Sequence, residues 1–188
     1  SAAADAHYGT MATWDFFMER FDRNGIRDDG VGSLSRVHYG NNYTNAFWSD
    51  SCVGMTYGDG DGSVLSPLVA IDVIAHEMSH GVTSATSGLV YFWDAGGMNE
   101  AFSDIMGTAV EFYAADQGID SDPDFYIGED IYTPGTPGDA LRYMDDPSKD
   151  GRSIVHASQM RFFTDPHYSS DLPNYVFYLA AQGGTPVS

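Results

Sequence analysis

The chain has 188 residues and a hydrophobic content of 43%, which favours a globular protein with a hydrophobic core and excludes a largely disordered one. Its formal net charge of −19 at pH 7 argues against nucleic acid and anionic membranes as partners, because an acidic surface repels both. The sequence contains no apolar run of the roughly eighteen residues that a membrane helix requires, so we expect no membrane-spanning segment.

The first part of the chain predicts one helix followed by short strands. Residues 10–21 form an amphipathic helical pattern whose large apolar side chains fall on one stripe: Trp14, Phe17, Met18 and Phe21. We interpret residues 23–32 as a polar loop and residues 58–62 as a tight turn rather than a metal site. Three strands are predicted in this part, separated by Asn and Gly turns: residues 35–39, 45–48 and 54–57.

The sequence His-Glu-Met-Ser-His at residues 76–80 is expected within a helix, because Pro67 and the apolar run 68–75 precede it. Residues i and i+4 of a helix project from one face about 6 Å apart, so His76 and His80 can bind one ion. Glu77 points to the side, where it can contact a water molecule held by that ion. A catalytic zinc site needs this combination of two imidazoles and a carboxylate. The alternative is an exposed helix face with two unrelated histidines.

A second helix is predicted from residue 97 to about residue 115, with Glu100 and Asp104 one turn apart on the same face. Glu100 is the expected third zinc ligand. Asp104 can accept a hydrogen bond from the second ring nitrogen of a ligating histidine. The preference of acidic residues for a helix N-terminus is the alternative explanation, and it suits Glu100 better than Asp104.

The remainder of the chain is expected to be irregular over residues 117–142, with a last helix beginning near Pro173. Because strands come mainly before the long helices, we predict the α+β fold class. Five acidic residues offer hard oxygen ligands from several segments, which suits calcium rather than zinc: Asp72, Glu111, Asp122, Asp124 and Glu129. The alternative is an acidic loop that is merely solvated.

The segments HEMSHGVTSATSGLVY and GGMNEAFSDIMGTAVEFY resemble the thermolysin family of zinc metalloendopeptidases. The later DGRSI and DPHYSS segments are more similar to its pseudolysin and vibriolysin branch, and the similarity runs from about residue 5 to residue 185. It implies a β-rich N-terminal lobe and a helical C-terminal lobe, with the zinc-binding helix at the floor of the cleft. Residues 1–86 would be the end of the first lobe and residues 87–188 the start of the second, in one catalytic domain that lacks parts of both ends.

The resemblance also implies that the protein is a secreted zinc endopeptidase that calcium stabilises. Glu77 would act first as general base and then as general acid. Tyr91 and His167 match the family's oxyanion donors, with Asp165 orienting His167. From the residues alone, a half-buried core tyrosine and a loop histidine are the alternatives. Asp171 stands where the family usually has glycine.

Further residues follow from the same resemblance. Asn45 and Ala46 match an edge strand that pairs with an extended peptide, and Arg142 matches an arginine that binds a peptide carbonyl, with a structural salt bridge as the alternative. The walls of the apolar pocket for the residue after the scissile bond align with Leu65, Leu68, Val73, Ile127 and Leu141. Cleavage before a bulky hydrophobic residue is therefore expected. Tyr126 would add a backbone carbonyl to the calcium site. Three residues resemble the ligands of a further calcium site: Tyr132, Thr133 and Asp139.

The expected partners are peptide or protein substrates, and the protein's own propeptide is a further candidate. Two other functions remain open. The chain could be a zinc- and calcium-binding fragment without turnover, if the cleft is incomplete. It could instead capture peptides or a propeptide without cleaving them, but that function gives Glu77 no role.

Overall fold

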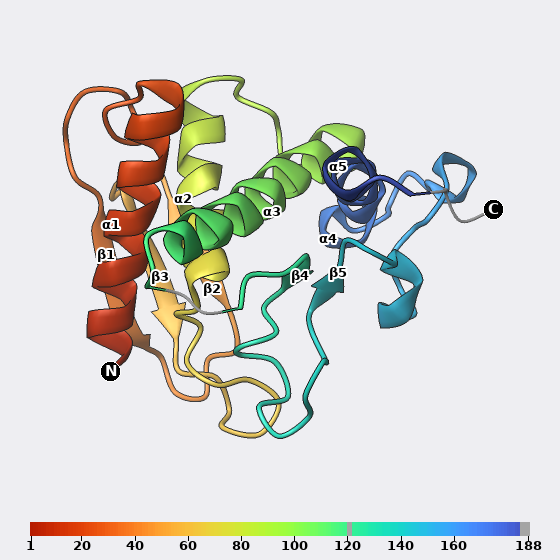
Figure 1. The fold of residues 1–188 in the computed structure, drawn as a ribbon, viewed down its shortest axis with the longest axis horizontal. Coiled ribbons are helices and arrows are strands. Elements are labelled where there is room, and N and C mark those ends of the chain that lie inside the picture. Colours follow the sequence, from red (N-terminus) through yellow and green to blue (C-terminus); the bar gives the residue numbers. More distant parts are fainter. Residues whose placement is uncertain (120–121, 185–188) are drawn as a thin grey trace.

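The computed structural model describes residues 1–119 and 122–184. Its first half contains α1 (Ala2–Phe21), β1 (Leu34–Tyr39), β2 (Ala46–Ser49), β3 (Gly54–Gly58) and α2 (Ile71–Ala85). Its second half contains the long α3 (Trp93–Asp116), the short strands β4 (Tyr126–Ile127) and β5 (Arg142–Tyr143), the 3₁₀ helices η1 (Pro147–Asp150) and η2 (Ala157–Gln159), α4 (Pro166–Ser169) and α5 (Asp171–Gln182) (Figure 1). The predicted second region, residues 87–188, includes 120–121 and 185–188, which lie outside the described residues.

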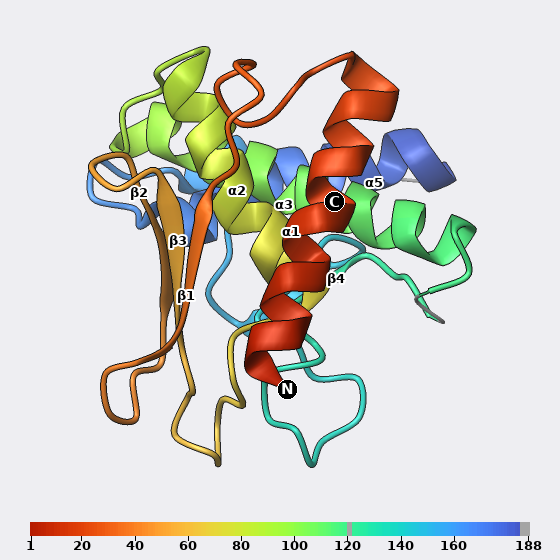
Figure 2. The ribbon, with the colours of Figure 1, turned by 90° about the vertical axis from the view of Figure 1, so that its left-hand side faces the viewer.

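The first three strands form one sheet in the order β1-β3-β2, with β1 parallel and β2 antiparallel to β3. All three predicted strands are present, with bounds that agree to within one residue. Figure 2 views this sheet nearly edge-on, with α1 and α2 on the same side of it. The middle strand β3 is buried along its whole length, because it is covered by helices as well as paired on both edges. Strand β2 lies at the edge of the sheet.

Helix α1 begins at Ala2, eight residues before the predicted start at residue 10. The early Ala residues carry little periodicity, but Ala has the highest intrinsic helix propensity. Tertiary packing adds a second reason at Gly9, where a Cβ atom would lie only 2.5 Å from the Cδ1 atom of Ile74. The two helices therefore approach closely at this glycine, and Ile74 is completely buried.

Helix α2 contains the His-Glu-Met-Ser-His sequence, as predicted, and it is the central element of the fold (Figure 1). It packs against α1, against the sheet, and most extensively against α3. The α2–α3 contact is close at Gly107, where a Cβ atom would lie 2.7 Å from the carbonyl oxygen of Asp72. Only a residue without a side chain allows α3 to come this near to the first turn of α2.

Helix α3 begins at Trp93 rather than at the predicted residue 97. Glycine disfavours a helix in isolation. Gly96 and Gly97 therefore weaken the helical signal of the first turn of α3 in the sequence. In the folded chain α4 packs directly on both: a Cβ atom would lie 2.9 Å from Pro166 at Gly96 and 2.5 Å from the Ser169 hydroxyl at Gly97. Close packing with α4 thus overrides local propensity here.

The segment after α3 crosses back beneath α2 and α3, and it is less irregular than predicted (Figure 1). Strands β4 and β5 pair in antiparallel fashion through Tyr126 with Tyr143 and Ile127 with Arg142. An isolated bridge between Leu65 and Tyr132 ties this segment to the loop before α2. The last helix, α5, begins at Asp171, two residues before the predicted Pro173. Within the described residues, the helices are too short or too polar to cross a bilayer.

Candidate active site

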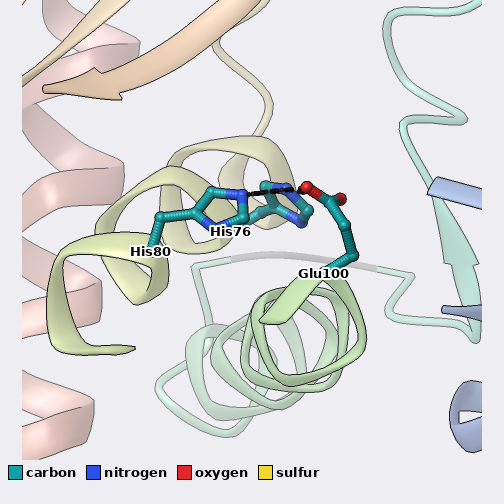
Figure 3. A group of neighbouring side chains, drawn as sticks. All are labelled: His76, His80 and Glu100. Carbon is teal, nitrogen blue, oxygen red and sulfur yellow. Dashed lines mark hydrogen bonds and ion pairs between the residues drawn. The ribbon is translucent and has the colours of Figure 1, made fainter. Parts of the chain in front are cut away.

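Two histidines of α2 and one glutamate of α3 converge on a single point (Figure 3). The Nε2 atoms of His76 and His80 lie 3.0 Å apart, and Glu100 places Oε2 3.4 Å from His76 Nε2 and Oε1 3.3 Å from His80 Nε2. Ligands at zinc's usual distances of about 2.0–2.1 Å, arranged as a tetrahedron, lie about 3.3 Å from one another. The three side chains therefore fit a zinc ion, and three ligands leave a fourth coordination position for another group.

Each histidine is oriented by a partner at its other ring nitrogen. His76 Nδ1 lies 2.8 Å from Asp104 Oδ1, and His80 Nδ1 lies 2.7 Å from Asn99 Oδ1. Both partners present an oxygen, so each Nδ1 carries the proton and each Nε2 offers a lone pair toward Glu100. Asn99 is itself fixed, because its Nδ2 donates to the carbonyl oxygen of Leu89 at 3.0 Å. The two rings are thus held in the tautomer that binds a metal.

The electrostatics of the three residues favour a positive charge between them. Burial opposes the charge of Glu100, but His76, His80 and His167 hold its pKa well below the usual range. Burial also opposes the charged form of His80, but Glu100, Glu77 and Asn99 raise its pKa to about 9. A divalent cation at this point would provide that positive charge and leave the imidazoles neutral.

Glu77 is buried beside the three ligands, where two cavities meet. The first cavity has a volume of about 410 Å³ and the second about 590 Å³, and His76, Glu77 and His167 line both. A group bound at the fourth coordination position of a metal would face these cavities. The Glu77 carboxylate is therefore placed to exchange a proton with such a group.

Tyr91 and His167 both lie next to Glu100. The Tyr91 hydroxyl donates to Glu100 Oε1 at 2.5 Å and lies 3.2 Å from His167 Nε2. His167 Nδ1 lies 2.8 Å from the Oδ1 atom of Asp165, the N-cap residue of α4, which orients the ring. Burial and the charge of Glu100 raise the pKa of Tyr91 well above its usual value, so its hydroxyl stays protonated. Both side chains can donate hydrogen bonds next to the metal position.

Arg142 forms the salt bridge that the sequence left open as an alternative. Its Nε and Nη2 atoms donate to the Oδ2 and Oδ1 atoms of Asp104 at 2.8 and 2.6 Å, and both residues are buried. Although burial opposes the charge of Asp104, Arg142 and His76 hold its pKa well below the usual range. Arg142 also lines the first cavity, so the salt bridge does not remove it from reach of a bound peptide.

The first cavity brings together every residue that the sequence predicted to contact substrate. These residues belong to, or directly precede, the edge strand β2, α2 and the strands β4 and β5: Asn45, Ala46, Leu65, Leu68, Val73, Ile127, Leu141 and Arg142. The five large apolar members are separated by up to 76 residues in sequence, from Leu65 to Leu141, yet they line the same cavity, and we call them its apolar wall. An apolar wall next to the ligand cluster can hold a hydrophobic side chain.

Two family models match the chain in succession. The model of the thermolysin metallopeptidase catalytic domain matches residues 1–84, and the model of the thermolysin metallopeptidase alpha-helical domain matches residues 87–188. The chain belongs to the thermolysin family of metallopeptidases. The α+β fold class and the thermolysin-like resemblance predicted from the sequence are thereby confirmed.

Individual relatives agree with this assignment to the thermolysin family. The chain is 56% identical to the transglutaminase-activating metalloprotease of Streptomyces mobaraensis, covering 99% of this chain and 24% of that protein, and 48% identical to bacillolysin of Bacillus cereus, covering 98% and 32%. Among solved structures, the precursor of protealysin, a metalloproteinase from Serratia proteamaculans, has a TM-score of 0.84 at 34% identity, covering 96% of this chain and 59% of that one. The chain thus spans about a quarter to a third of the length of the curated relatives that it matches.

A second acidic cluster in this thermolysin-family chain lies away from the histidines. Glu111 of α3 and the loop residues Asp124 and Glu129 offer oxygen atoms that all lie within 4.8 Å of one another. Burial and the charge of Asp72 raise the pKa of Glu129 well above its usual value. Carboxylates forced this close together favour a cation with oxygen ligands.

Three other residues of the predicted calcium set lie outside this three-carboxylate cluster. The Oδ2 atom of Asp72 accepts the amide of Gly128 at 2.6 Å, which ties α2 to the loop. Asp122 is exposed, and burial together with the charge of Asp122 raises the pKa of Asp124. The amide of Tyr126 donates to Asp124 Oδ1 at 2.6 Å.

The segment predicted as a further calcium site has its carboxylate engaged by protein donors. The hydroxyl groups of Thr133 and Tyr143 each donate to Asp139 at 2.8 Å, and the amide of Ala140 donates at 3.1 Å. These donors lower the pKa of Asp139. Tyr132 and Asp139 both line the first cavity.

Several residues that support the site had not been singled out from the sequence. Asn99 had only its position before Glu100 as a signal. Asn174 of α5 donates through Nδ2 to Asp104 Oδ2 at 2.8 Å and to Asp171 Oδ1 at 3.3 Å. Asp171 is fully buried and is also hydrogen-bonded to the Ser153 hydroxyl. The residue in place of the family's glycine is thus linked, through Asn174 and Asp104, to the ligand His76.

Proposed function

We propose that the protein is a zinc-dependent endopeptidase. One observation carries the proposal: three side chains sit at the mutual distances of tetrahedral zinc ligands, with a carboxylate beside them and a peptide-sized cavity in front. Membership of the thermolysin family and the names of its relatives support the same activity. Zinc would be held by His76, His80 and Glu100.

A bound zinc ion acts as a Lewis acid and brings the pKa of bound water to about 7. The chain's own residues then perform the proton transfers and the charge stabilisation. Glu77 would accept a proton from the attacking water and deliver it to the leaving amine. The Tyr91 hydroxyl and His167 would donate hydrogen bonds to the oxygen on which negative charge develops. Asp165 would keep His167 in the orientation required.

The same geometry supports a substrate class. The outer edge of β2 is available for main-chain pairing with an extended peptide, and Asn45 and Ala46 at its start line both cavities. The apolar wall of the first cavity would take the residue that follows the scissile bond. We therefore infer cleavage of peptides and proteins before a bulky hydrophobic residue.

Calcium is the second proposed cofactor, at the cluster of Glu111, Asp124 and Glu129. Its role would be structural, because the cluster ties α3 to the loop that carries β4. Addition of calcium after treatment with a calcium-selective chelator should raise the melting temperature, and Glu129→Gln should abolish most of this rise. At a calcium concentration about 100 times the dissociation constant, the stabilisation is about 2.7 kcal/mol. An identical calcium response in Glu129→Gln would contradict the assignment.

Two further proposals concern the whole protein. We propose secretion from the resemblance to the thermolysin family, and the solved precursor of protealysin supports the protein's own propeptide as a partner for the same cleft. Residues 1–86 and 87–188 would form the adjoining parts of the two lobes of one catalytic domain, with α2 at the junction. The site described here would then lie between them.

The experiment that tests the activity is Glu77→Gln, with peptide hydrolysis and bound zinc measured on the same sample. We expect loss of hydrolysis with zinc retained, because Glu77 is not a ligand. Glu19→Gln is the matched control, since Glu19 is exposed on α1 and undergoes the same chemical change. Full hydrolysis by Glu77→Gln would refute the assigned base. Zinc binding by the unaltered protein without any hydrolysis would favour the alternative of a metal-binding fragment without turnover.

A further inference from the structure

The first cavity holds an unusual share of the chain's few cations. The sequence has eight Lys and Arg residues against 27 Asp and Glu residues. Three of those eight line this single cavity: Arg142, Lys149 and Arg152. A concentration of positive charge in one cavity of such an acidic protein calls for a physical explanation.

Two of the three cations already have carboxylate partners. Arg142 is buried and bound to Asp104 through two hydrogen bonds. Lys149 lies 2.6 Å from Asp145 and sits over the rings of Tyr126 and Tyr143. Their charges are therefore largely satisfied within the protein.

Arg152 differs from both. It is exposed, and its Nη1 atom donates to a neutral partner, the hydroxyl of Tyr168, at 3.2 Å. Within the described residues, no carboxylate oxygen lies within ion-pair distance of its guanidinium. Its neighbour Asp150 instead accepts the backbone amides of Arg152 and Ser153, both at 2.8 Å, and the Ser153 hydroxyl at 2.6 Å.

The other carboxylates that line the first cavity are also occupied. The oxygens of Asp139 accept from Thr133, Tyr143 and Ala140, and Asp165 pairs with His167. Glu77 stands at the ligand cluster. Arg152 is therefore the one cation of this cavity, within the part of the chain that the structure describes, whose planar guanidinium remains open to a ligand carboxylate.

The position of Arg152 fixes the side of the substrate that it can contact. Arg152, Lys149 and Tyr168 line the first cavity and not the second. The first cavity carries the apolar wall, which the proposed function assigns to the residue after the scissile bond. A group that contacts Arg152 thus belongs to the leaving half of the peptide.

We propose that Arg152 is a specificity-determining residue that recognises a substrate carboxylate on the leaving side, next to the hydrophobic residue that follows the scissile bond. This inference rests on the proposed endopeptidase function. The carboxylate has two sources, namely the side chain of an Asp or Glu or the free C-terminus of a short substrate. The guanidinium can bind either one through two parallel hydrogen bonds.

The test compares matched peptides with Leu after the scissile bond. One pair has Glu or Gln at the next position and an amidated C-terminus, and a second pair has Gln there with a free or an amidated C-terminus. Competition within each pair gives the ratio of kcat/KM values for the unaltered protein, Arg152→Gln and Arg152→Glu. Exposed ion pairs correspond to preferences of about two- to fivefold. We expect a preference of this size for the carboxylate in at least one pair, a ratio near one in Arg152→Gln and a reversed preference in Arg152→Glu.

Arg161→Gln is the matched control. Arg161 is also an exposed arginine, but it donates to the carbonyl oxygens of Ser158 and Met160 and does not line the first cavity. Arg161→Gln should keep the full preference, and added salt should weaken that preference in the unaltered protein. The pair that shows the preference identifies the source of the carboxylate. Equal rates within both pairs, or a preference that persists in Arg152→Gln, would overturn the proposal.

A binding measurement keeps the proposal testable if the protein cleaves nothing. Dissociation constants for the same peptides can be measured by calorimetry on the zinc-loaded Glu77→Gln protein and on Glu77→Gln combined with Arg152→Gln. Tighter binding of the carboxylate peptide that disappears in the double variant would support the role of Arg152 even if the proposed function fails. If the carboxylate peptide has the same dissociation constant in both proteins, the proposal is overturned even if the protein is an active endopeptidase.

Discussion

Asp104 is the single residue on which most of the buried polar contacts of the site depend. Its Oδ1 atom accepts from His76 Nδ1 at 2.8 Å and from Arg142 Nη2 at 2.6 Å, and its Oδ2 atom accepts from Arg142 Nε and from Asn174 Nδ2, each at 2.8 Å. The four donor atoms belong to three residues in three elements: His76 of α2, Arg142 of β5 and Asn174 of α5. We therefore choose Asp104→Asn as the most informative change, because it keeps the size and removes the charge.

The expected magnitude follows from these four contacts. Whichever way the Asn side chain is turned, its amide NH₂ faces two donors, so two hydrogen bonds are lost and the buried Arg142 loses its counter-charge. Breaking one side of a buried ion pair costs about 3–5 kcal/mol. Loss of the carboxylate behind a ligating histidine weakens metal binding by about 10- to 100-fold. Asp104→Asn should therefore reduce both the free energy of unfolding and the affinity for zinc by these amounts.

Two assays check this expectation. Urea unfolding with zinc present gives the stability, and competition with a chromophoric chelator gives the zinc affinity. The double variant Asp104→Leu with Arg142→Leu should be less destabilised than the sum of its two single variants, because it leaves no unpaired buried charge. Wild-type stability and zinc affinity in Asp104→Asn would refute the reasoning, since the four contacts would then contribute nothing measurable.

Three other expectations can be tested on the same protein. Gly107→Ala should lower stability by about 1–3 kcal/mol in thermal unfolding, because its Cβ atom would meet the Asp72 carbonyl oxygen at 2.7 Å, and wild-type stability would disprove the close α2–α3 contact. His167→Ala should lower kcat by about 10²–10³-fold with little change in KM, and a change confined to KM would contradict its role as an oxyanion donor. Burial raises the pKa of Asp171 to about 7, above its unfolded value, so its contribution to stability is complete below about pH 4 and is lost as the pH rises to 7. The stability of the unaltered protein relative to Asp171→Asn should thus fall by about 3 kcal/mol from pH 4 to pH 7, and a flat difference between the two would refute the buried, protonated carboxyl.

Much of the fold could be predicted because its patterns are local. The strands β1, β2 and β3 are predicted to within one residue, and a helix is correctly predicted around His76, from alternation, apolar runs and turn residues. Two helices start earlier than predicted. Helix α1 starts at Ala2, because its first alanines carry little periodicity, and α3 starts at Trp93, because Gly96 and Gly97 reduce the local signal and packing with α4 restores the helix.

The residues of the candidate site also fall into those that a local pattern indicates and those that it does not. The spacing of His76 and His80 already places two imidazoles on one helix face, and the one-turn spacing of Glu100 and Asp104 places two carboxylates on another. The partner Asn99 lacked a comparable signal, because an asparagine in a helix has many uses. Asn174 lacked one as well, since it lies 70 residues from Asp104. Arg152 is one arginine among several in the sequence, and only its place in the first cavity distinguishes it.

The sequence by itself determined which chemical groups are available and which of them share a helical turn, because helix geometry is the same in every protein. It thereby determined the ligand types of the proposed zinc site, the neighbouring carboxylate Glu77 and the acidic loop. The tertiary structure decided the distances between elements: the close approach of α3 to α2 at Gly107, the docking of α4 and α5, and the closure of the first cavity. These distances result from packing among residues far apart in the chain, and no local pattern encodes them.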